Sequence, residues 1–239
     1  MPTGSMIDAL AVIIGGFLGA FFKDKIPERL STALPLTFGA ASMGMGIDLI
    51  TDMDALPPVI LSLLIGSALG ELMNLEKGIE WCASKVRGPV ERLFSGGNTE
   101  LSQEAFMEKF VGIVVLFCAS GTGIFGALNE GMTGNTSILI SKSFLDLFTA
   151  AIFATALGYM VITVAVPQFV ILVGLFMSAG VILPLTEPHM IADFSGVGGI
   201  IMLVTGFRIS GIKSFPIGNM LPALVLAMPV SELWKMFMG

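Results

Sequence analysis

The sequence is short of charge, cysteine and histidine. Charged residues make up 13% of the 239 residues, whereas soluble domains have about 25%. Neither cysteine, Cys82 or Cys118, has a disulfide framework or a metal-binding spacing around it, so we expect free thiols. The single histidine, His189, is expected in an interfacial loop. The net charge of −6 leaves no basic surface for nucleic acid, and we expect no nucleic-acid partner.

The sequence also lacks the usual marks of catalysis. It has no nucleophile with a spaced base, no metal motif and no phosphate-binding loop. We therefore expect neither an enzyme nor a resident cofactor.

Long apolar runs dominate the chain instead. Hydrophobic residues make up 54% of it, and a membrane-spanning helix needs about 20 mainly apolar residues in succession. The runs predict an all-α protein, a polytopic transmembrane helix bundle of about eight spans. The expected spans are roughly residues 6–22, 32–50, 57–74, 106–128, 138–161, 166–184, 196–212 and 217–237.

A long connection near residues 75–105 separates two groups of spans. Its apolar residues recur every three or four positions between Lys and Arg, which predicts an amphipathic helix on the inner leaflet. We predict a first transmembrane bundle of three spans over 1–75, a cytoplasmic amphipathic connection over 76–105, and a second bundle of five spans over 106–239. The order of the spans permits a three-span inverted repeat, which is common in secondary transporters.

The basic residues favour one orientation of this bundle. With eight spans and an outer N-terminus, only Lys142 and Lys235 of the twelve Lys and Arg residues fall toward the outer side. Such an excess on the inner side is typical of membrane proteins. We therefore predict that both termini lie outside.

Polar residues are concentrated between Cys118 and Asp146. The Ser-Gly-Thr-Gly segment at 120–123 lies past the middle of the expected fourth span, where glycine costs about 1 kcal/mol relative to alanine. This predicts a broken helix and a helical hairpin near 118–137. The ends of a broken helix expose backbone groups that can bind ions or solutes, although a kink that improves packing is the alternative.

Lys142 and Asp146 are the strongest charged candidates. They lie four residues apart on one helix face within an apolar run, and ionisable residues inside spans usually face the bundle interior. Lys142 can instead reach the membrane surface, and the two can form a purely structural pair. Asp8 is expected at the outer interface. The candidate substrate-binding residues are Ser120, Gly121, Thr122, Gly123, Asn129, Glu130, Lys142, Asp146 and Asn219.

Five stretches carry a resemblance to a known family. They are, in order, PTGSMIDALAVIIGG, KDKIPERL, CASGTGIFGALNEGMTGNTSILISKSFLD, IFATALG and VGGIIMLVTGFRISGIKSFPIGNMLPAL. They resemble the YqgA-type family of small bacterial inner-membrane proteins, a domain of unknown function. The family usually carries Asn where Asp8 stands, a Gly-Ser pair at 121–122 and an acidic pair at 129–130. The resemblance implies a polytopic protein of the bacterial inner membrane.

These features together predict a small secondary transporter that moves a small solute or ion across the bacterial inner membrane by alternating access. We expect the lipid bilayer and a small solute or ion as partners, a homodimer, and sodium or a proton as the coupling ion. An ion channel or gated pore is one alternative. A non-transporting membrane sensor or assembly partner is the other.

Overall fold

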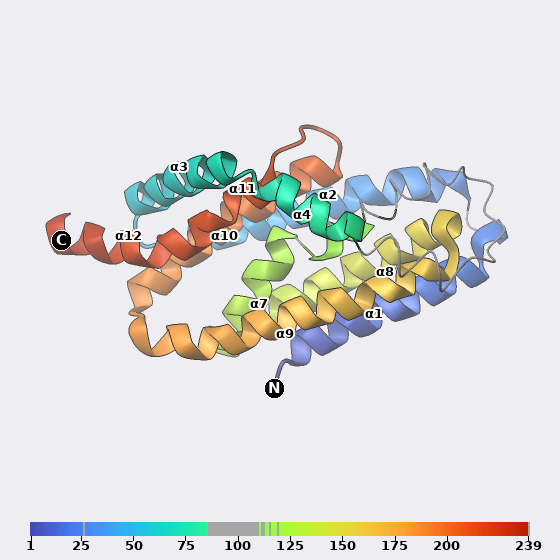
Figure 1. Ribbon diagram of the computed structural model, residues 1–239, viewed down its shortest axis with the longest axis horizontal. Helices are drawn as coiled ribbons and strands as arrows, with labels where there is room; N and C mark the ends of the chain where they lie inside the picture. The colour runs from blue at the N-terminus through green and yellow to red at the C-terminus, as the bar shows by residue number, and fades with distance from the viewer. Residues whose placement is uncertain (26, 86–109, 111–112, 115, 119, 239) are drawn as a thin grey trace. The chain divides into compact units, whose positions relative to one another are not determined.

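The computed structural model describes residues 1–25, 27–85, 110, 113–114, 116–118 and 120–238. All regular structure in these ranges is helical, which confirms the expected all-α fold (Figure 1). The start of the long connection is helical, as α4 (Leu75–Lys85), and the amphipathic helix expected in this connection stays a prediction. The rest of that connection, and the start of the expected fourth span, lie outside the described residues.

The chain folds into two compact units, and each combines two separate stretches of sequence. Unit 1 contains Met1–Pro35 and Ile79–Met177, and unit 2 contains Leu36–Gly78 and Ser178–Gly239. The first boundary falls inside α2 (Glu28–Thr51), at a proline, where a helix loses one backbone hydrogen bond. The division expected from the sequence stays a prediction, and the two compact units cut across it.

In unit 1, helix α1 packs closely along α8, and glycines make the approach possible. A Cβ atom on Gly15 would lie 2.1 Å from the backbone oxygen of Leu147, and one on Gly19 would lie 1.9 Å from that of Ala151. The later glycine of α1 meets the later residue of α8, so the two helices run parallel. The helices of this unit are α1 (Thr3–Phe21), α7 (Gly121–Thr133), α8 (Ser137–Leu157) and the larger part of α9 (Ala165–Ile182).

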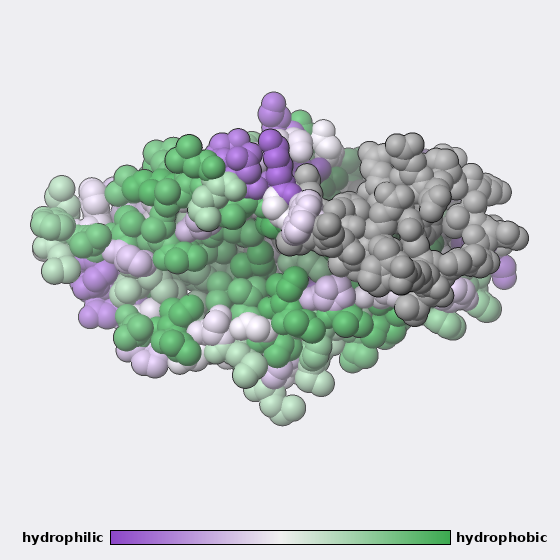
Figure 2. All heavy atoms as spheres, viewed as in Figure 1, coloured by the Kyte–Doolittle hydropathy of each residue, from purple (hydrophilic) through white to green (hydrophobic). Residues whose placement is uncertain are grey.

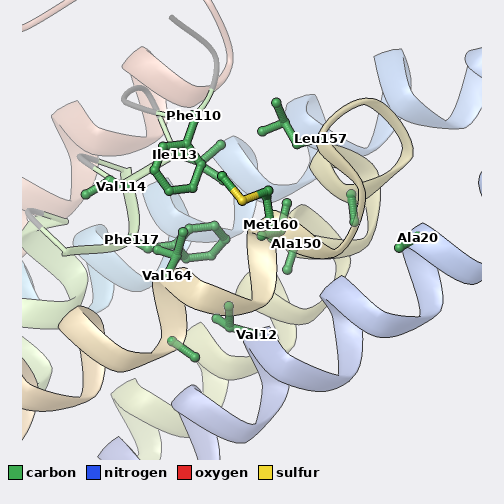
Figure 3. Close-up of a cluster of buried hydrophobic side chains, with 13 residues drawn as sticks. Val12, Ala20, Phe110, Ile113, Val114, Phe117, Ala150, Leu157, Met160 and Val164 are labelled. Carbon is green, nitrogen blue, oxygen red and sulfur yellow. The ribbon is translucent and has the colours of Figure 1, made fainter. Parts of the chain in front are cut away.

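An apolar core lies beside this helix pair (Figure 3). Val12 contributes from α1, and aromatic side chains at 110 and 117 contribute from the segment before α7. The 3₁₀ turn η2 (Gly158–Val164) supplies further members between α8 and α9. The buried residues are Val12, Ala20, Phe110, Ile113, Val114, Phe117, Ala150, Ala154, Leu157, Met160, Val161, Val164 and Ala165.

The chain breaks its helical path at Ser120, as the sequence predicts. Residues 116–118 are helical, Ser120 has extended backbone (φ −67°, ψ 128°), and α7 then starts at Gly121. Gly134 ends α7 in the left-handed region (φ 76°), which glycine adopts without steric cost. The short turn to α8 makes the expected helical hairpin. With 13 residues, α7 is about 20 Å long, shorter than the roughly 30 Å hydrocarbon core.

In unit 2, glycines again bring helices together, here in antiparallel pairs. A Cβ atom on Gly39 of α2 would lie 2.7 Å from the backbone oxygen of Gly206, whereas one on Gly46, later in α2, would lie 2.5 Å from that of the earlier Gly199. Helix α3 lies in the same way against α11 and α12, through its glycines at 66 and 70. The remaining helices are α3 (Leu56–Met73), α10 (Pro188–Ile209), α11 (Ile217–Met220) and α12 (Pro222–Met238).

On the face shown in Figure 2, apolar side chains cover much of the surface of the described residues. The described residues include five helical stretches long and apolar enough to cross a membrane, and a shorter apolar helix over Leu36–Thr51. Most helix ends agree with the spans expected from the sequence, but α10 begins at Pro188 rather than near 196. The five stretches are Thr3–Phe21, Leu56–Met73, Ser137–Ile182, Pro188–Ile209 and Ile217–Met238.

Candidate functional site

Four polar side chains from three helices of unit 1 meet in its interior, and we call them the polar centre. Asp8 comes from α1, Lys142 and Asp146 come from successive turns of α8, and Gln168 comes from α9. Asp8 and Gln168 are fully buried, and Lys142 and Asp146 are 2% and 8% exposed. Polar groups this deep within apolar helices are costly unless they are paired.

Two donors bridge the two carboxylates of the polar centre. The Lys142 Nζ donates to Asp8 Oδ2 at 3.0 Å and to Asp146 Oδ2. The Gln168 Nε2 donates to the same two oxygens, at 2.7 Å and 2.8 Å. Among the described atoms, Asp8 Oδ1 and Gln168 Oε1 are buried without a hydrogen-bond partner. The polar centre therefore keeps two acceptor oxygens that a bound cation or proton can use.

The polar centre contains two carboxylates but only one ammonium. Two carboxylates share the single ammonium of Lys142, so with all three groups ionised the centre carries one negative charge in excess. The N-terminus of α7, which starts beside Lys142, contributes a partial positive charge of about half an elementary charge. That partial charge offsets some of the excess and leaves the rest uncompensated.

The helix break lies directly against the polar centre. A Cβ atom on Gly123, in the first turn of α7, would lie 2.9 Å from Lys142 Cε. The Lys142 Nζ is 5.8 Å from the ring centroid of Phe117, which precedes the break, within the range of a cation–π interaction. Ser120 caps α7 by accepting a hydrogen bond from the Gly123 N–H at 3.4 Å. The broken helix and the charged pair, both predicted from the sequence, thus form one region.

The remaining candidates on α7 are buried along the helix. Thr122 is 3% exposed, Asn129 is 8% exposed and Glu130 is 2% exposed. The Glu130 Oε1 accepts a hydrogen bond from the Gly4 N–H at 2.8 Å, in the first turn of α1, where backbone N–H groups lack helical partners. Glu130 therefore holds the start of α1.

Asn219 makes its contacts elsewhere, in unit 2. Its Oδ1 accepts from the Glu76 N–H at 2.8 Å, and its Nδ2 donates to Glu71 Oε2 at 2.5 Å. Glu76 in turn accepts from the Gly218 N–H at 2.6 Å and from Arg208 at 2.5 Å. These contacts tie together the ends of α3, α4, α10 and α11. Asn219 thus belongs to a hydrogen-bonded group of unit 2, and its role in substrate binding stays a prediction.

Sequence reasoning missed two members of the polar centre. Asp8, expected at the membrane interface, is fully buried against Lys142. Gln168 was not considered. Each is a lone polar residue in an apolar run, and this pattern is the sequence signal that could have identified both of them. A single sequence does not show which distant spans pack together, so it could not reveal that α1, α8 and α9 bring these residues into contact.

Two polar residues near the start of α10 also differ from expectation. His189, expected in a loop, lies in the first turn of α10 and is 9% exposed. Asp193, which precedes the expected span over 196–212, is 1% exposed. Its Oδ1 accepts from the Asp54 and Ala55 N–H groups at 3.1 Å and 2.8 Å, just before α3 begins, and its Oδ2 accepts from Ser231 Oγ at 2.6 Å. Asp193 thus anchors the start of α3.

Comparison with known proteins agrees with this picture. Residues 3–232 match the family described as "Protein of unknown function (DUF554)". The chain belongs to this family. It is 50% identical over 234 residues to "Uncharacterized protein YqgA" of Escherichia coli (strain K12), with 98% of each chain covered. It is 28% identical over 227 residues to "Uncharacterized membrane protein YdfK" of Bacillus subtilis (strain 168), with 93% of each chain covered. No solved structure matches the chain.

The family match confirms the resemblance found in the sequence. The membrane-protein relative and the apolar helices together identify a membrane protein of unknown function. The chemistry that its polar centre can support follows from its atoms. Carboxylate and amide oxygens are hard ligands that suit protons and hard cations, and the excess negative charge favours one positive ion.

Proposed function

We propose that this protein is a small secondary transporter that moves a small solute or ion by alternating access. In this proposal the polar centre binds sodium or a proton as the coupling ion. The observation that carries the proposal is that two buried carboxylates, those of Asp8 and Asp146, share the one ammonium of Lys142 inside an apolar helical unit. A purely structural group would be more stable with its charges balanced.

The broken helix gives the coupling ion a way to act on the fold. Because Gly123 lies against the Lys142 stem, movement of Lys142 between its two carboxylates changes the contact at the start of α7. A bound cation neutralises the excess charge, and its release leaves two carboxylates competing for one ammonium. The α7–α8 hairpin is therefore the element whose position we expect to change with ion occupancy.

The helix directions support an eight-span arrangement. Helix α1 is parallel to α8, whereas α2 is antiparallel to α10, and α3 is antiparallel to α12. If α1, α2 and α3 cross in turn, α8 can run parallel to α1 only when an odd number of crossings separates α3 from α8. A crossing over the fourth span predicted from the sequence, residues 106–128, would meet this condition. Both termini then lie on one side, and the distribution of Lys and Arg favours the outer side of the bacterial inner membrane.

The proposal is tested with purified protein in proteoliposomes on a solid-supported membrane. Rapid addition of a panel of inorganic ions, amino acids, organic acids and sugars is expected to give transient currents for at least one compound. Asp146→Asn should abolish the current, because it removes one of the two charged oxygen donors. Asp52→Asn, at an exposed position, is the matched control and should keep it.

Two results would contradict the proposal. Full currents in an Asp8→Asn/Asp146→Asn double variant would exclude the polar centre from transport. Steady unitary currents in planar bilayers, far above the rates of carriers, would identify a channel.

A further inference from the structure

A second charged group lies in unit 2, at the start of α10 and near the end of α12. It contains Glu187, His189, Glu232 and Lys235, and we call it the histidine cluster. One ligand atom each from Glu187, His189 and Glu232 lies within 4.8 Å of the other two. Imidazole and carboxylate are the side chains that bind Zn²⁺ and related divalent ions.

His189 is an unusual member of this group because it is buried and incompletely paired. Its side chain is 8% exposed, and its Nε2 lies 3.2 Å from Glu232 Oε2. The two atoms face each other, and within the described part of the chain neither of them has another hydrogen-bond partner. Two ligands of one tetrahedral zinc ion, with bonds of about 2.0–2.2 Å, lie about 3.3 Å apart. The spacing of His189 Nε2 and Glu232 Oε2 fits that geometry.

The charge of the cluster also favours a cation. Two carboxylates face one ammonium, so with a neutral imidazole the cluster carries one excess negative charge. The side chains of Glu187 and Glu232 are 60% and 41% exposed, so an ion can reach them from water. Lys235, whose side chain is 55% exposed, lies 3.1 Å from Glu187 Oε2 and 3.2 Å from His189 Nδ1. A cationic group thus already occupies one side of the imidazole.

We propose that Glu187, His189 and Glu232 form a binding site for a divalent transition-metal ion such as Zn²⁺, with the Lys235 ammonium as its internal competitor. Lys235 has only donors, so its contact with Nδ1 favours the tautomer that carries the ring proton on Nε2. Metal binding at Nε2 needs the other tautomer, in which the proton lies on Nδ1, and Lys235 then has to move away because both groups would be donors. The site is independent of the polar centre and of the proposed transport.

Because Lys235 competes with the metal ion, the proposal predicts opposite changes in Zn²⁺ affinity when Lys235 and when the ligands are replaced. Zn²⁺ binding is measured by competition with a chromogenic chelator, using the full-length, detergent-purified chain with a histidine-free affinity tag. We expect one ion per chain, at least tenfold weaker binding in His189→Ala and in Glu232→Gln, and tighter binding in Lys235→Gln. Asp52→Asn removes an exposed carboxylate of the same unit and should leave affinity unchanged. Size-exclusion profiles confirm that each variant is folded.

A second readout uses the fact that the chain has a single histidine. Zn²⁺ should slow the modification of His189 by diethyl pyrocarbonate in the wild type, whereas Mg²⁺ should not. If these residues only form ion pairs that join α10 to α12, Lys235→Gln should gain no affinity for metal, and Zn²⁺ should not protect His189. The proposal is overturned by Zn²⁺ binding that His189→Ala leaves unchanged, by binding in Lys235→Gln that is no tighter than in the wild type, or by a lack of protection in the wild type.

Discussion

Replacement of Lys142 should damage the fold far more than replacement of either of its carboxylate partners. Lys142→Met leaves Asp8 and Asp146 buried together, with Gln168 as their shared donor. Asp8→Asn or Asp146→Asn instead leaves one carboxylate and one ammonium, which is a balanced pair. Because one ammonium serves two carboxylates, the loss of the ammonium should destabilise the fold much more than the loss of one carboxylate.

The expected size of this asymmetry follows from burial. Lys142 is 2% exposed and Asp8 is fully buried, and removing one partner of such a pair costs about 3–5 kcal/mol. In a chain of this size, about 1 kcal/mol shifts the melting midpoint by 2–4 °C. Lys142→Met should thus lower the apparent midpoint by about 6–20 °C. Each asparagine variant retains an acceptor oxygen and should lose under about 1.5 kcal/mol.

The assay is thermal unfolding of the detergent-purified chain, followed by intrinsic fluorescence and by size-exclusion chromatography after heating. Lys77→Met, at an exposed position, is the matched control and should change the midpoint little. Adding Asp146→Asn to Lys142→Met should recover part of the loss, because a single buried carboxylate then remains. Equal losses in Lys142→Met and Asp8→Asn, or no loss in Lys142→Met, would refute the idea that one ammonium serves two carboxylates.

Two further predictions concern the packing of the units. Gly19→Ala should destabilise unit 1 by about 1–3 kcal/mol, measured by the same melts, because its Cβ would lie 1.9 Å from the Ala151 oxygen. Gly174→Ala, where nothing lies within 4 Å of a new Cβ, is the control, and an equal loss there would contradict the packing argument. Asp193→Ala should lower the midpoint of unfolding and speed proteolysis near the start of α3, because it leaves two N–H groups and the Ser231 hydroxyl without their acceptor. Asp52→Ala is the comparison. If Asp193→Ala does not speed proteolysis near the start of α3, Asp193 does not anchor this helix.

Local sequence signals predicted the helices and the break well. Apolar length located most span ends, and the Ser-Gly-Thr-Gly segment located the start of α7, because chain geometry at these points depends on neighbouring residues. Helix α10 begins earlier than the apolar run, at Pro188, and includes the buried carboxylate of Asp193. Hydropathy alone missed this extension because His189 and Asp193 are polar residues with partners on other helices.

The sequence did not predict which helices pack side by side. The i, i+4 spacing predicted that Lys142 and Asp146 share a face, and they do. It did not predict that α1 contributes Asp8 or that α9 contributes Gln168, because contacts 134 and 160 residues apart depend on which spans pack together. The same limit applies to Asn219, which joined the polar candidates by composition and proved to bind the ends of other helices in unit 2.

The most direct test of the account is whether the polar centre binds a positive ion. The melting midpoint of the purified chain is measured as Na⁺ replaces choline at constant ionic strength, at several pH values. At about 100 times its dissociation constant, a bound ion adds about 2.7 kcal/mol of stability. The account predicts that the wild-type midpoint rises with Na⁺ or with acidification, and that the Asp8→Asn/Asp146→Asn double variant loses this rise. A midpoint that responds to neither ion, or an undiminished response in the double variant, would contradict it.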